Sequence, residues 1–418
     1  MAPSSDTVSR DDGNWITNEF LQEVIEKDNP SKKVSIISKD IQLAVGKGEN
    51  YLSIIFRVEA EYKQENSDYS EKCHLIIKGL PDGDYIRKFI FESGVFVREL
   101  SIYQTALPLI YRFAEEKLKT VPAITPKAFV TSRDNTVVLE DLKYKGFRMA
   151  NRKNMLNLQH CKVVVRNMAR LHGMSAAFHK YNPGIINQYT EIFLCEKNRE
   201  NMEKFVPVQL NCLLKSVQSW PGFETYAAKL EKYIPFALDR VIKVCELQES
   251  GFHVLTHGDC WTNNYLFKYS LEGEPIEVCF IDFQLSRIGS PATDLSYFMY
   301  SSPQNEIRTK HMDQLLREYH TELEETLTAL GCDPSIFTFQ DLKNEMKRLA
   351  CYGLFAASSI MPIVVADAED TPDLAEITED DINRGETSYW EKIQKNPRFK
   401  EVLQHMLPHF DELGVFDN

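Results

Sequence analysis

The chain has 418 residues, of which 43% are hydrophobic and 26% are charged, as is ordinary for a globular protein with a large core. Its 48 basic and 61 acidic residues give a formal net charge of −13, which argues against nucleic acid or an anionic membrane as a partner. None of the nine cysteines forms a C-x-x-C pair, so the sequence indicates neither a zinc knuckle nor a thioredoxin motif.

Two stretches bear on where the protein resides. Residues 1–14 are polar and lack an apolar signal core, so we expect a disordered tail on a cytoplasmic protein with reduced thiols. Residues 349–366 form an apolar run, but the run contains Tyr352 and Pro362 and ends in acids. It therefore predicts a buried helix and no membrane span.

The N-terminal part changes from a helical to a strand pattern. Apolar residues at helical spacing predict a helix over 16–26, and a period of two predicts strands within 33–79. Two of these strands flank a loop that holds Gly46, Gly48 and Asn50. A glycine loop between strands is neither a Rossmann fingerprint nor a Walker A loop. It is either a simple hairpin turn or a phosphate-covering loop, with Asn50 where a third glycine would stand.

A lysine and a glutamate follow in the next two elements. Lys78 ends an apolar strand, where a lysine that grips nucleotide phosphates would stand, although a strand-end lysine is more often simply exposed. The helix predicted over 89–103 carries Glu99 in its middle. Such a lysine needs one helix glutamate to orient it, for which Glu99 is the first choice and Glu92 the second. The alternative for either glutamate is a solvated surface charge.

A strand over 136–140 then runs into the acidic turn Glu140-Asp141-Leu142. In a two-lobe kinase such a turn is the hinge, whose backbone groups bind adenine. The pattern after it is mostly helical, so we predict a boundary between two lobes here.

These patterns predict a lobe over 15–142, a hinge near 139–143 and a second lobe over 143–418. The second lobe begins with a long amphipathic helix over 156–178 that contains His172. We expect His172 to be packed and hydrogen-bonded there, and not to be catalytic.

The segment His257–Asn264 has the H-x-D-x-x-x-x-N spacing of a kinase catalytic loop. Strands predicted over 265–267 and 276–281 follow, and Asp282 stands at the end of the second strand. Phosphoryl transfer needs a carboxylate that takes the acceptor proton, and amide and carboxylate oxygens that hold Mg²⁺ against the phosphates. Asp294, which opens the next helix, is read as an N-terminal cap.

With these residues the chain resembles the aminoglycoside phosphotransferase and choline kinase branch of the protein-kinase-like fold, which carries H-G-D in place of H-R-D. A closer resemblance is to the ecdysteroid kinase-like family of arthropods, and it spans about residues 15–415. It rests on the glycine loop, the segment 257–264, Ile281-Asp282-Phe283-Gln284 and Asp294-Leu295-Ser296-Tyr297-Phe298. The resemblance implies an α+β fold of two lobes, with a small antiparallel-sheet N-lobe and a large, mainly helical C-lobe.

The resemblance also implies ATP- and Mg²⁺-dependent phosphorylation of a hydroxyl on a small molecule, either an ecdysteroid at C-22 or a xenobiotic alcohol or glycoside that is detoxified. By position, Asp259 is the catalytic base, and Asn264 and Asp282 hold Mg²⁺. Lys78 grips phosphate and Glu99 orients it. Gln284 replaces the glycine of D-F-G, and no A-P-E segment is evident, which argues against a protein substrate.

Three rival functions stay open. The first is the same chemistry on choline, ethanolamine or a sugar; a choline site would offer acids and aromatics, and a steroid site an apolar cleft. The second is a pseudokinase that only binds a ligand, although a pure binder has no need of Asp259 or Asn264. The third is a scaffold role, for which no feature of the sequence argues.

Overall fold

The computed structural model describes residues 13–44, 53–65, 67–80, 90, 92–367, 370 and 388–417. The chain forms two compact units. The first unit comprises Met1–Glu92, Pro126–Lys145 and Asp373–Ile377, and the second comprises Ser93–Thr125, Gly146–Pro372 and Thr378–Asn418. Within the predicted tail, residues 1–12 lie outside the described part of the chain, and the predicted lobe boundary at 142 stays a prediction.

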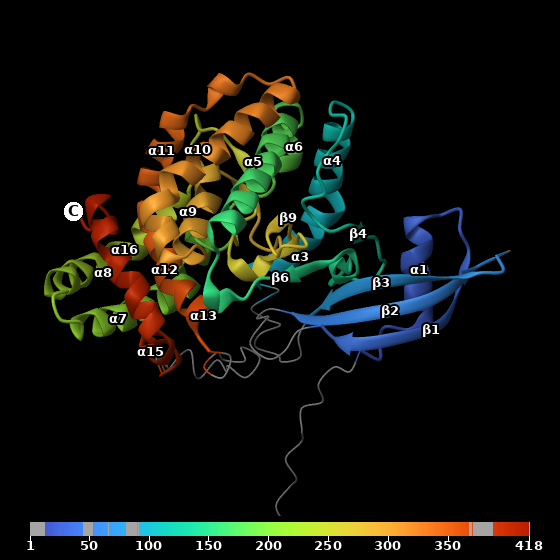
Figure 1. The fold of residues 1–418 in the computed structure, drawn as a ribbon, viewed down its shortest axis with the longest axis horizontal. Helices are drawn as coiled ribbons and strands as arrows, with labels where there is room; N and C mark the ends of the chain where they lie inside the picture. The colour runs from blue at the N-terminus through green and yellow to red at the C-terminus, as the bar shows by residue number, and fades with distance from the viewer. Residues whose placement is uncertain are drawn as a thin grey trace, which may run out of the picture. The chain divides into compact units, whose positions relative to one another are not determined.

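The first unit is built on one antiparallel sheet with the strand order β1-β2-β3-β5-β4 (Figure 1). Helix α1 (Asn18–Asp28), capped by the Thr17 side chain, packs Leu21 and Val24 into a core with Val58 and Leu75 of the sheet. The strands are β1 (Val34–Leu43), β2 (Ile54–Gln64), β3 (Ser70–Gly79), β4 (Ala128–Phe129) and β5 (Thr136–Glu140), and η2 (Leu142–Lys145) follows. The helix and strands predicted from periodicity up to residue 79 are thus present.

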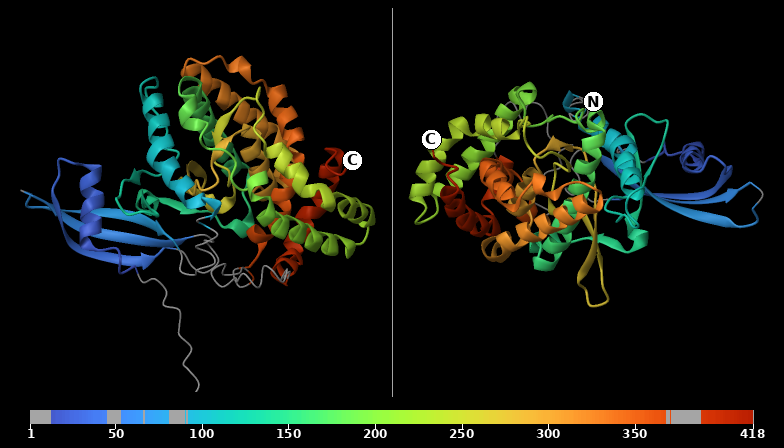
Figure 2. Two further views of the ribbon diagram at one scale, coloured as in Figure 1. Left: turned by 180° about the vertical axis from the view of Figure 1, so that it is seen from behind. Right: turned by 90° about the horizontal axis from the view of Figure 1, so that it is seen from above.

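The second unit is mainly helical. Its longest helices, α5 (Leu158–Tyr181) and α10 (Asn305–Ala329), lie side by side, and α7 (Arg199–Gln218) pairs with α8 (Glu224–Cys245) (Figure 2). The other helices are α3 (Val95–Ser101), η1 (Ile102–Ala106), α4 (Leu107–Glu115), η3 (Arg152–Asn154), α6 (Pro183–Ile186), η4 (Glu196–Asn198), η5 (Thr262–Asn264), α9 (Pro291–Ser301), η6 (Pro334–Ile336), α11 (Phe339–Arg348), α12 (Ala350–Ser359), α13 (Met361–Val365), α15 (Ser388–Gln394) and α16 (Pro397–Glu412).

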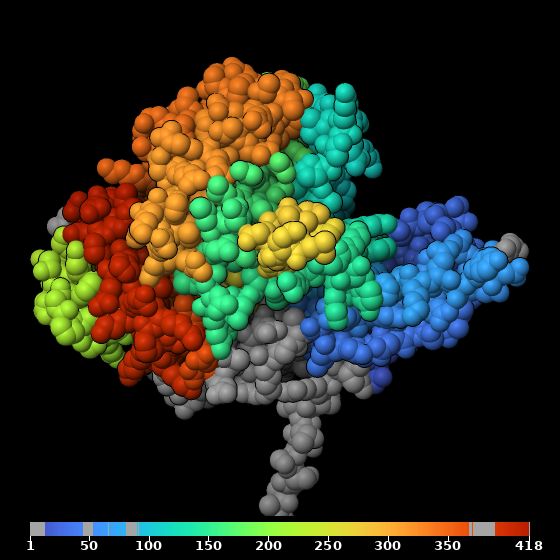
Figure 3. All heavy atoms as spheres, viewed as in Figure 1, coloured from blue at the N-terminus to red at the C-terminus, as the bar shows by residue number. Residues whose placement is uncertain are grey.

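Two small sheets in this unit carry the segments around residue 260. β10 (Arg287–Gly289) pairs with β7 (Val254–Thr256), and β8 (Tyr265–Tyr269) lies between β6 (Phe147–Met149) and β9 (Pro275–Phe280). The turn between β8 and β9 reaches the surface (yellow in Figure 3), where the Leu271 side chain is fully exposed. β8 and β9 confirm the two strands predicted on either side of this turn. The α+β class, with an antiparallel N-terminal sheet and a mainly helical remainder, is confirmed as well.

Two predicted helices differ from those in the structure. The helix expected over 89–103 is interrupted at Gly94, whose φ of +72° is left-handed. Residues 90, 92 and 93 are helical, and α3 begins at Val95 and continues through the π-helical turn η1 into α4, so the helical stretch extends to Glu115. The buried helix expected over 349–366 is divided into α12 and α13, because Pro362 lies in the first turn of α13, where a proline is tolerated.

In the described part of the chain, no single helix has the length and apolar character to cross a membrane. One bent helix pair, Pro334–Arg348 with Ala350–Val365, reaches those values jointly across a bend of 54°.

Candidate active site

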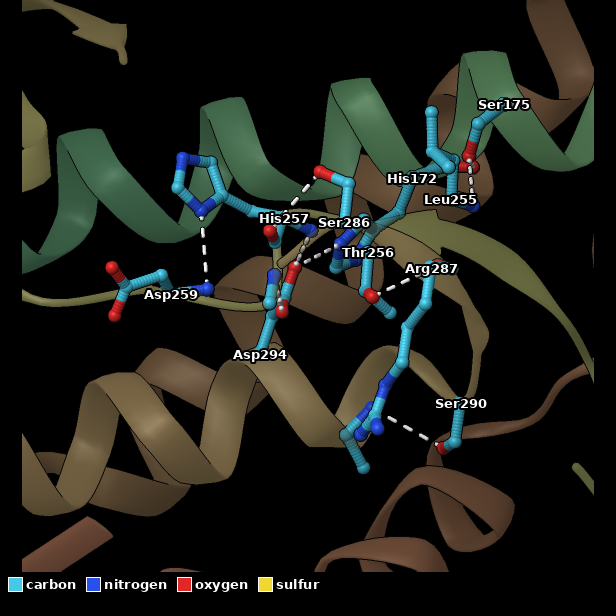
Figure 4. A network of polar contacts seen from close by, with 12 residues as sticks. His172, Ser175, Leu255, Thr256, His257, Asp259, Ser286, Arg287, Ser290 and Asp294 are labelled. Atoms are coloured by element: carbon cyan, nitrogen blue, oxygen red, sulfur yellow. Dashed lines mark hydrogen bonds and ion pairs between the residues drawn. The ribbon is translucent and has the colours of Figure 1, made fainter. Parts of the chain in front are cut away.

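The loop between β7 and β8 is held by one buried carboxylate, that of Asp294 in α9 (Figure 4). Its Oδ2 accepts a hydrogen bond from the His257 backbone N–H at 2.6 Å, and its Oδ1 accepts one from the Gly258 N–H at 2.9 Å. His172 Nε2 lies 3.0 Å from the same Oδ2, and His172 Nδ1 lies 2.7 Å from the Tyr319 hydroxyl. Asp294 thus joins the loop to α5 and α10 through a fully buried network.

Burial alone would raise the pKa of Asp294, but the hydrogen bond from His172 and the nearby histidine charges outweigh it, so the pKa of this carboxyl lies below its usual range. Asp294 therefore stays ionised and accepts from both backbone amides. The cap of α9 is Ser290, not Asp294, so the predicted capping role of Asp294 is wrong. His172 is packed and hydrogen-bonded, as predicted.

Gly258 is required by the path of this loop. Its φ is +86°, in the left-handed region, and a Cβ built there would collide with the Leu285 carbonyl group. The His257 side chain adds a second tie, because its Nε2 lies 2.9 Å from the Ile281 carbonyl oxygen. The loop and the segment that carries Asp282 are therefore held together by backbone geometry and by His257.

Asp259 projects away from the Asp294 network (Figure 4). Its Oδ1 accepts a hydrogen bond from the Tyr297 hydroxyl at 2.6 Å, and its Oδ2 accepts one from Asn264 Nδ2 at 2.9 Å. Burial raises the pKa of the Asp259 carboxyl, and the neighbouring charge of Asp282 raises it further. Burial also raises the pKa of Tyr297 well above its usual value, so its hydroxyl stays protonated and can donate.

Asn264 and Asp282 are brought together by the register of one hairpin. Tyr265 pairs with Phe280, and the Ile281 N–H donates to the Asn264 carbonyl oxygen at 3.1 Å, so Asp282 follows directly beyond Asn264 across the ladder. The backbone of Asp282 is left-handed, with φ at +69°, which is uncommon for a residue with a side chain. Such backbone conformations are concentrated at functional sites.

The donor set here fits Mg²⁺. Mg²⁺ prefers oxygen ligands and is usually bound by one or two carboxylates, waters and substrate phosphates, not by a complete protein cage. Asn264 directs its amide N–H groups at Asp259, which leaves its Oδ1 as the oxygen available for a cation next to Asp282. Among the described residues no group of three or more His, Cys, Asp and Glu side chains could hold a metal alone.

Lys78 and Glu99 are both buried. Lys78, in β3 of the first unit, is 6% exposed, which rules out the simple exposed strand-end lysine. Glu99, in α3 of the second unit, is 1% exposed, whereas Glu92 is exposed, so the surface-charge alternative applies to Glu92 alone. Because Lys78 and Glu99 belong to different units, the pairing between them stays a prediction.

The three predicted hinge residues are held within the first unit. Asp141 forms an ion pair with Arg57 at 2.6 Å, and its Oδ1 accepts from the Lys143 N–H at 3.0 Å. Glu140 accepts from the backbone N–H of residue 127 at 2.9 Å, and Leu142 is buried. The acidic side chains of this turn are therefore occupied, and the binding role predicted for the turn stays a prediction. Gly46, Gly48 and Asn50 lie outside the described residues.

Sequence reasoning missed two functional candidates, the Asp294 clamp and the Tyr297 hydroxyl. Their segment, Asp294-Leu295-Ser296-Tyr297-Phe298, is a family mark in the sequence, where Asp294 was expected to be a helix cap. The sequence does hold a signal, because polar residues recur in a helix start that is otherwise apolar. In the structure every residue of α9 is buried. Buried polar groups need partners, so these had to meet polar atoms elsewhere.

Comparison with known proteins gives one family. The model of the ecdysteroid kinase-like family matches residues 47–332, which is more than half of the 418 residues. None of the curated proteins matches the sequence.

Two solved structures show low similarity. An ethanolamine kinase from Plasmodium vivax is 14% identical, with a TM-score of 0.37 over 87% of this chain and 84% of that one. A choline/ethanolamine kinase family protein from Mesorhizobium loti is 12% identical, with a TM-score of 0.31 over 88% of this chain and 92% of that one. Similarities of this size carry no argument about the substrate. The family match, which includes the whole loop from His257 to Asn264, shows that the chain belongs to the ecdysteroid kinase-like family.

Proposed function

We propose that this protein is an ATP- and Mg²⁺-dependent kinase that phosphorylates a hydroxyl group of a small molecule. The observation that carries the proposal is the arrangement around Asp259. A buried carboxylate is held at both oxygens by Tyr297 and Asn264, and the hairpin register brings Asp282 next to Asn264. A base beside two oxygen ligands for a cation is what phosphoryl transfer requires.

In this mechanism Asp259 accepts a hydrogen bond from the acceptor hydroxyl and takes its proton. A bond forms between the acceptor oxygen and the γ-phosphorus of ATP, while the bond from that phosphorus to the bridging oxygen of ADP breaks. Asn264 Oδ1 and Asp282 are the residues that would hold Mg²⁺. When bound, the cation would neutralise charge on the phosphates and on the leaving oxygen. The raised pKa of Asp259 moves it toward the range where a carboxylate is an effective base.

The nucleotide is assigned to residues of the first unit. We assign phosphate binding to Lys78, oriented by Glu99, and to the glycine loop with Gly46, Gly48 and Asn50. The adenine contact is assigned to the backbone of the turn Glu140-Asp141-Leu142, where η2 begins. The nine cysteines are all free, which supports the further proposal of a cytoplasmic location.

For the acceptor we propose an apolar alcohol such as an ecdysteroid or a xenobiotic, not a quaternary amine. This choice rests on the family match over residues 47–332. Choline and ethanolamine stay the rival acceptors. A small cavity beside His253 and Arg348 does not include Asp259, so we do not assign it to the acceptor.

The test is product formation. Purified protein is incubated with Mg·ATP and a panel of ecdysteroids, steroidal and phenolic glycosides, choline and ethanolamine, and products are read by mass spectrometry beside Asp259→Asn. The proposal expects a phosphate adduct on one apolar compound that is missing with the variant. An adduct on choline or ethanolamine instead would retain the kinase chemistry and refute the acceptor class.

The pseudokinase is the second candidate function, and calorimetry separates it from the first. Absence of every adduct while Mg·ATP still binds, repeated with a whole metabolite extract, would favour the pseudokinase. Absence of Mg·ATP binding would refute the kinase and favour a pseudokinase that binds another ligand.

A further inference from the structure

The carboxylate of Asp259 is held by a residue that has no part in the mechanism given above. Tyr297 donates to Oδ1 at 2.6 Å, and Asn264 donates to Oδ2 at 2.9 Å. Each carboxylate oxygen has two lone pairs, so each keeps one after these two hydrogen bonds. We propose that Tyr297 is a positioning residue, which fixes the rotation of the Asp259 carboxylate so that a free lone pair faces the acceptor hydroxyl. This inference rests on the proposed function.

The position of the Tyr297 hydroxyl is set by helix α9. Asp294 and Tyr297 are three residues apart, so their side chains lie on the same face of the helix. The first holds the backbone of the loop at His257 and Gly258, and the second holds the side chain of Asp259. One buried helix thus determines where both the main chain and the carboxylate of the loop stand.

The other side of the Tyr297 ring is supported as well. Helix α9 packs against α12, and Tyr352 of α12 lies 6.2 Å from the Tyr297 ring at a tilt of 44°. The side chain of Tyr297 is 4% exposed, so its ring has little freedom to turn. A rigid aromatic donor of this kind holds an acceptor with less rotational freedom than a flexible side chain would.

Tyr300 offers a matched control in the same helix. It is also buried, and its hydroxyl lies 2.9 Å from His409 Nε2 of α16, with no contact to Asp259. Tyr297→Phe and Tyr300→Phe each remove one hydroxyl oxygen from a buried, hydrogen-bonded tyrosine of α9. A merely structural contribution of a buried tyrosine hydroxyl would therefore affect both variants alike.

The test is steady-state kinetics of the full chain on the acceptor found by mass spectrometry. We expect Tyr297→Phe to lower kcat by about 10- to 100-fold, since small misplacement of a catalytic group has effects of this size. The KM for ATP and the affinity for Mg·ATP in calorimetry should stay within about twofold of wild type, because the Tyr297 hydroxyl donates to the base Asp259. Tyr300→Phe should keep the wild-type kcat.

Two results would overturn the inference. One is a Tyr297→Phe kcat within about twofold of wild type; the other is an equal fall of kcat in both tyrosine variants. If wild type itself shows no turnover above Asp259→Asn, it is the proposed function that fails. Crystal structures of wild type and Tyr297→Phe then still decide the positioning. The inference expects Asp259 in one orientation in wild type and rotated in the variant, and an unchanged Asp259 would refute it.

Discussion

Replacing Asp294 by asparagine tests the clamp on the catalytic loop. The change keeps the shape of the side chain but turns one of its acceptor oxygens into an NH₂ donor. Only one oxygen then remains for the backbone N–H groups of His257 and Gly258, which now lie 2.6 and 2.9 Å from two separate oxygens, and for His172. One buried N–H group would therefore face another donor.

The expected loss of stability follows from these contacts. Breaking a fully buried charge network by removing one partner destabilises a protein by about 3–5 kcal/mol. Leaving a single buried donor without an acceptor accounts for about 1–3 kcal/mol of this. We therefore expect Asp294→Asn to lower the free energy of unfolding in urea at pH 7 by about 3–5 kcal/mol. Because the loop carries Asp259, kcat should fall as well.

The pKa shift of Asp294 determines how this loss of stability changes with pH. The pKa of Asp294 is lower in the folded protein than its ordinary value of 3.8, so its stabilising effect is complete above that value and is lost as the pH falls through the folded pKa. The stability difference between wild type and Asp294→Asn should therefore be full at pH 7 and shrink in strongly acidic solution. Wild type and Asp294→Asn share all other carboxyl groups, so the contributions of those groups to the pH dependence of stability cancel in the difference.

Asp313→Asn is the control for this experiment. Asp313 is 57% exposed and pairs with Arg317 on the surface of α10, so its loss should change stability by at most about 1 kcal/mol. If Asp294→Asn lost no more stability than Asp313→Asn, the clamp would not hold the loop and the reasoning from buried hydrogen bonds would be wrong.

Three further changes test the other parts of the site. Asp259→Asn should abolish kcat while calorimetry still detects Mg·ATP binding; wild-type turnover in this variant would remove Asp259 as the base. Lys78→Met should lower kcat/KM by about 10²–10⁴, and an unchanged rate would mean that another cation grips the phosphates. Gly258→Ala should destabilise the chain by more than the roughly 1–2 kcal/mol of a left-handed alanine, because its Cβ meets the Leu285 carbonyl. Gly273→Ala, at φ +87° with open space around it, measures that backbone contribution alone, so equal losses in urea unfolding would exclude the collision.

The sequence by itself determined the features that depend on near neighbours in the chain. A period of two predicted the strands of the first unit, because alternate side chains of a strand face one core. The distance between Asp259 and Asn264, and the place of Asp282 after a strand, predicted that these groups meet, since pairing across a short hairpin sets their register. Lys78 and Glu99 are both buried, and their roles and their pairing stay predictions.

Only the tertiary structure decided which distant groups hold the catalytic loop. Asp294 reaches back to His257, and Tyr297 to Asp259, from a helix that begins more than thirty residues later, and His172 comes from a helix far earlier in the chain. Periodicity indicates which face of a helix is buried, but not which element it is buried against. The sequence pattern of α9 is compatible with an apolar core helix and with a helix whose polar side chains hold a loop. The packing of α9 against the loop decides for the second.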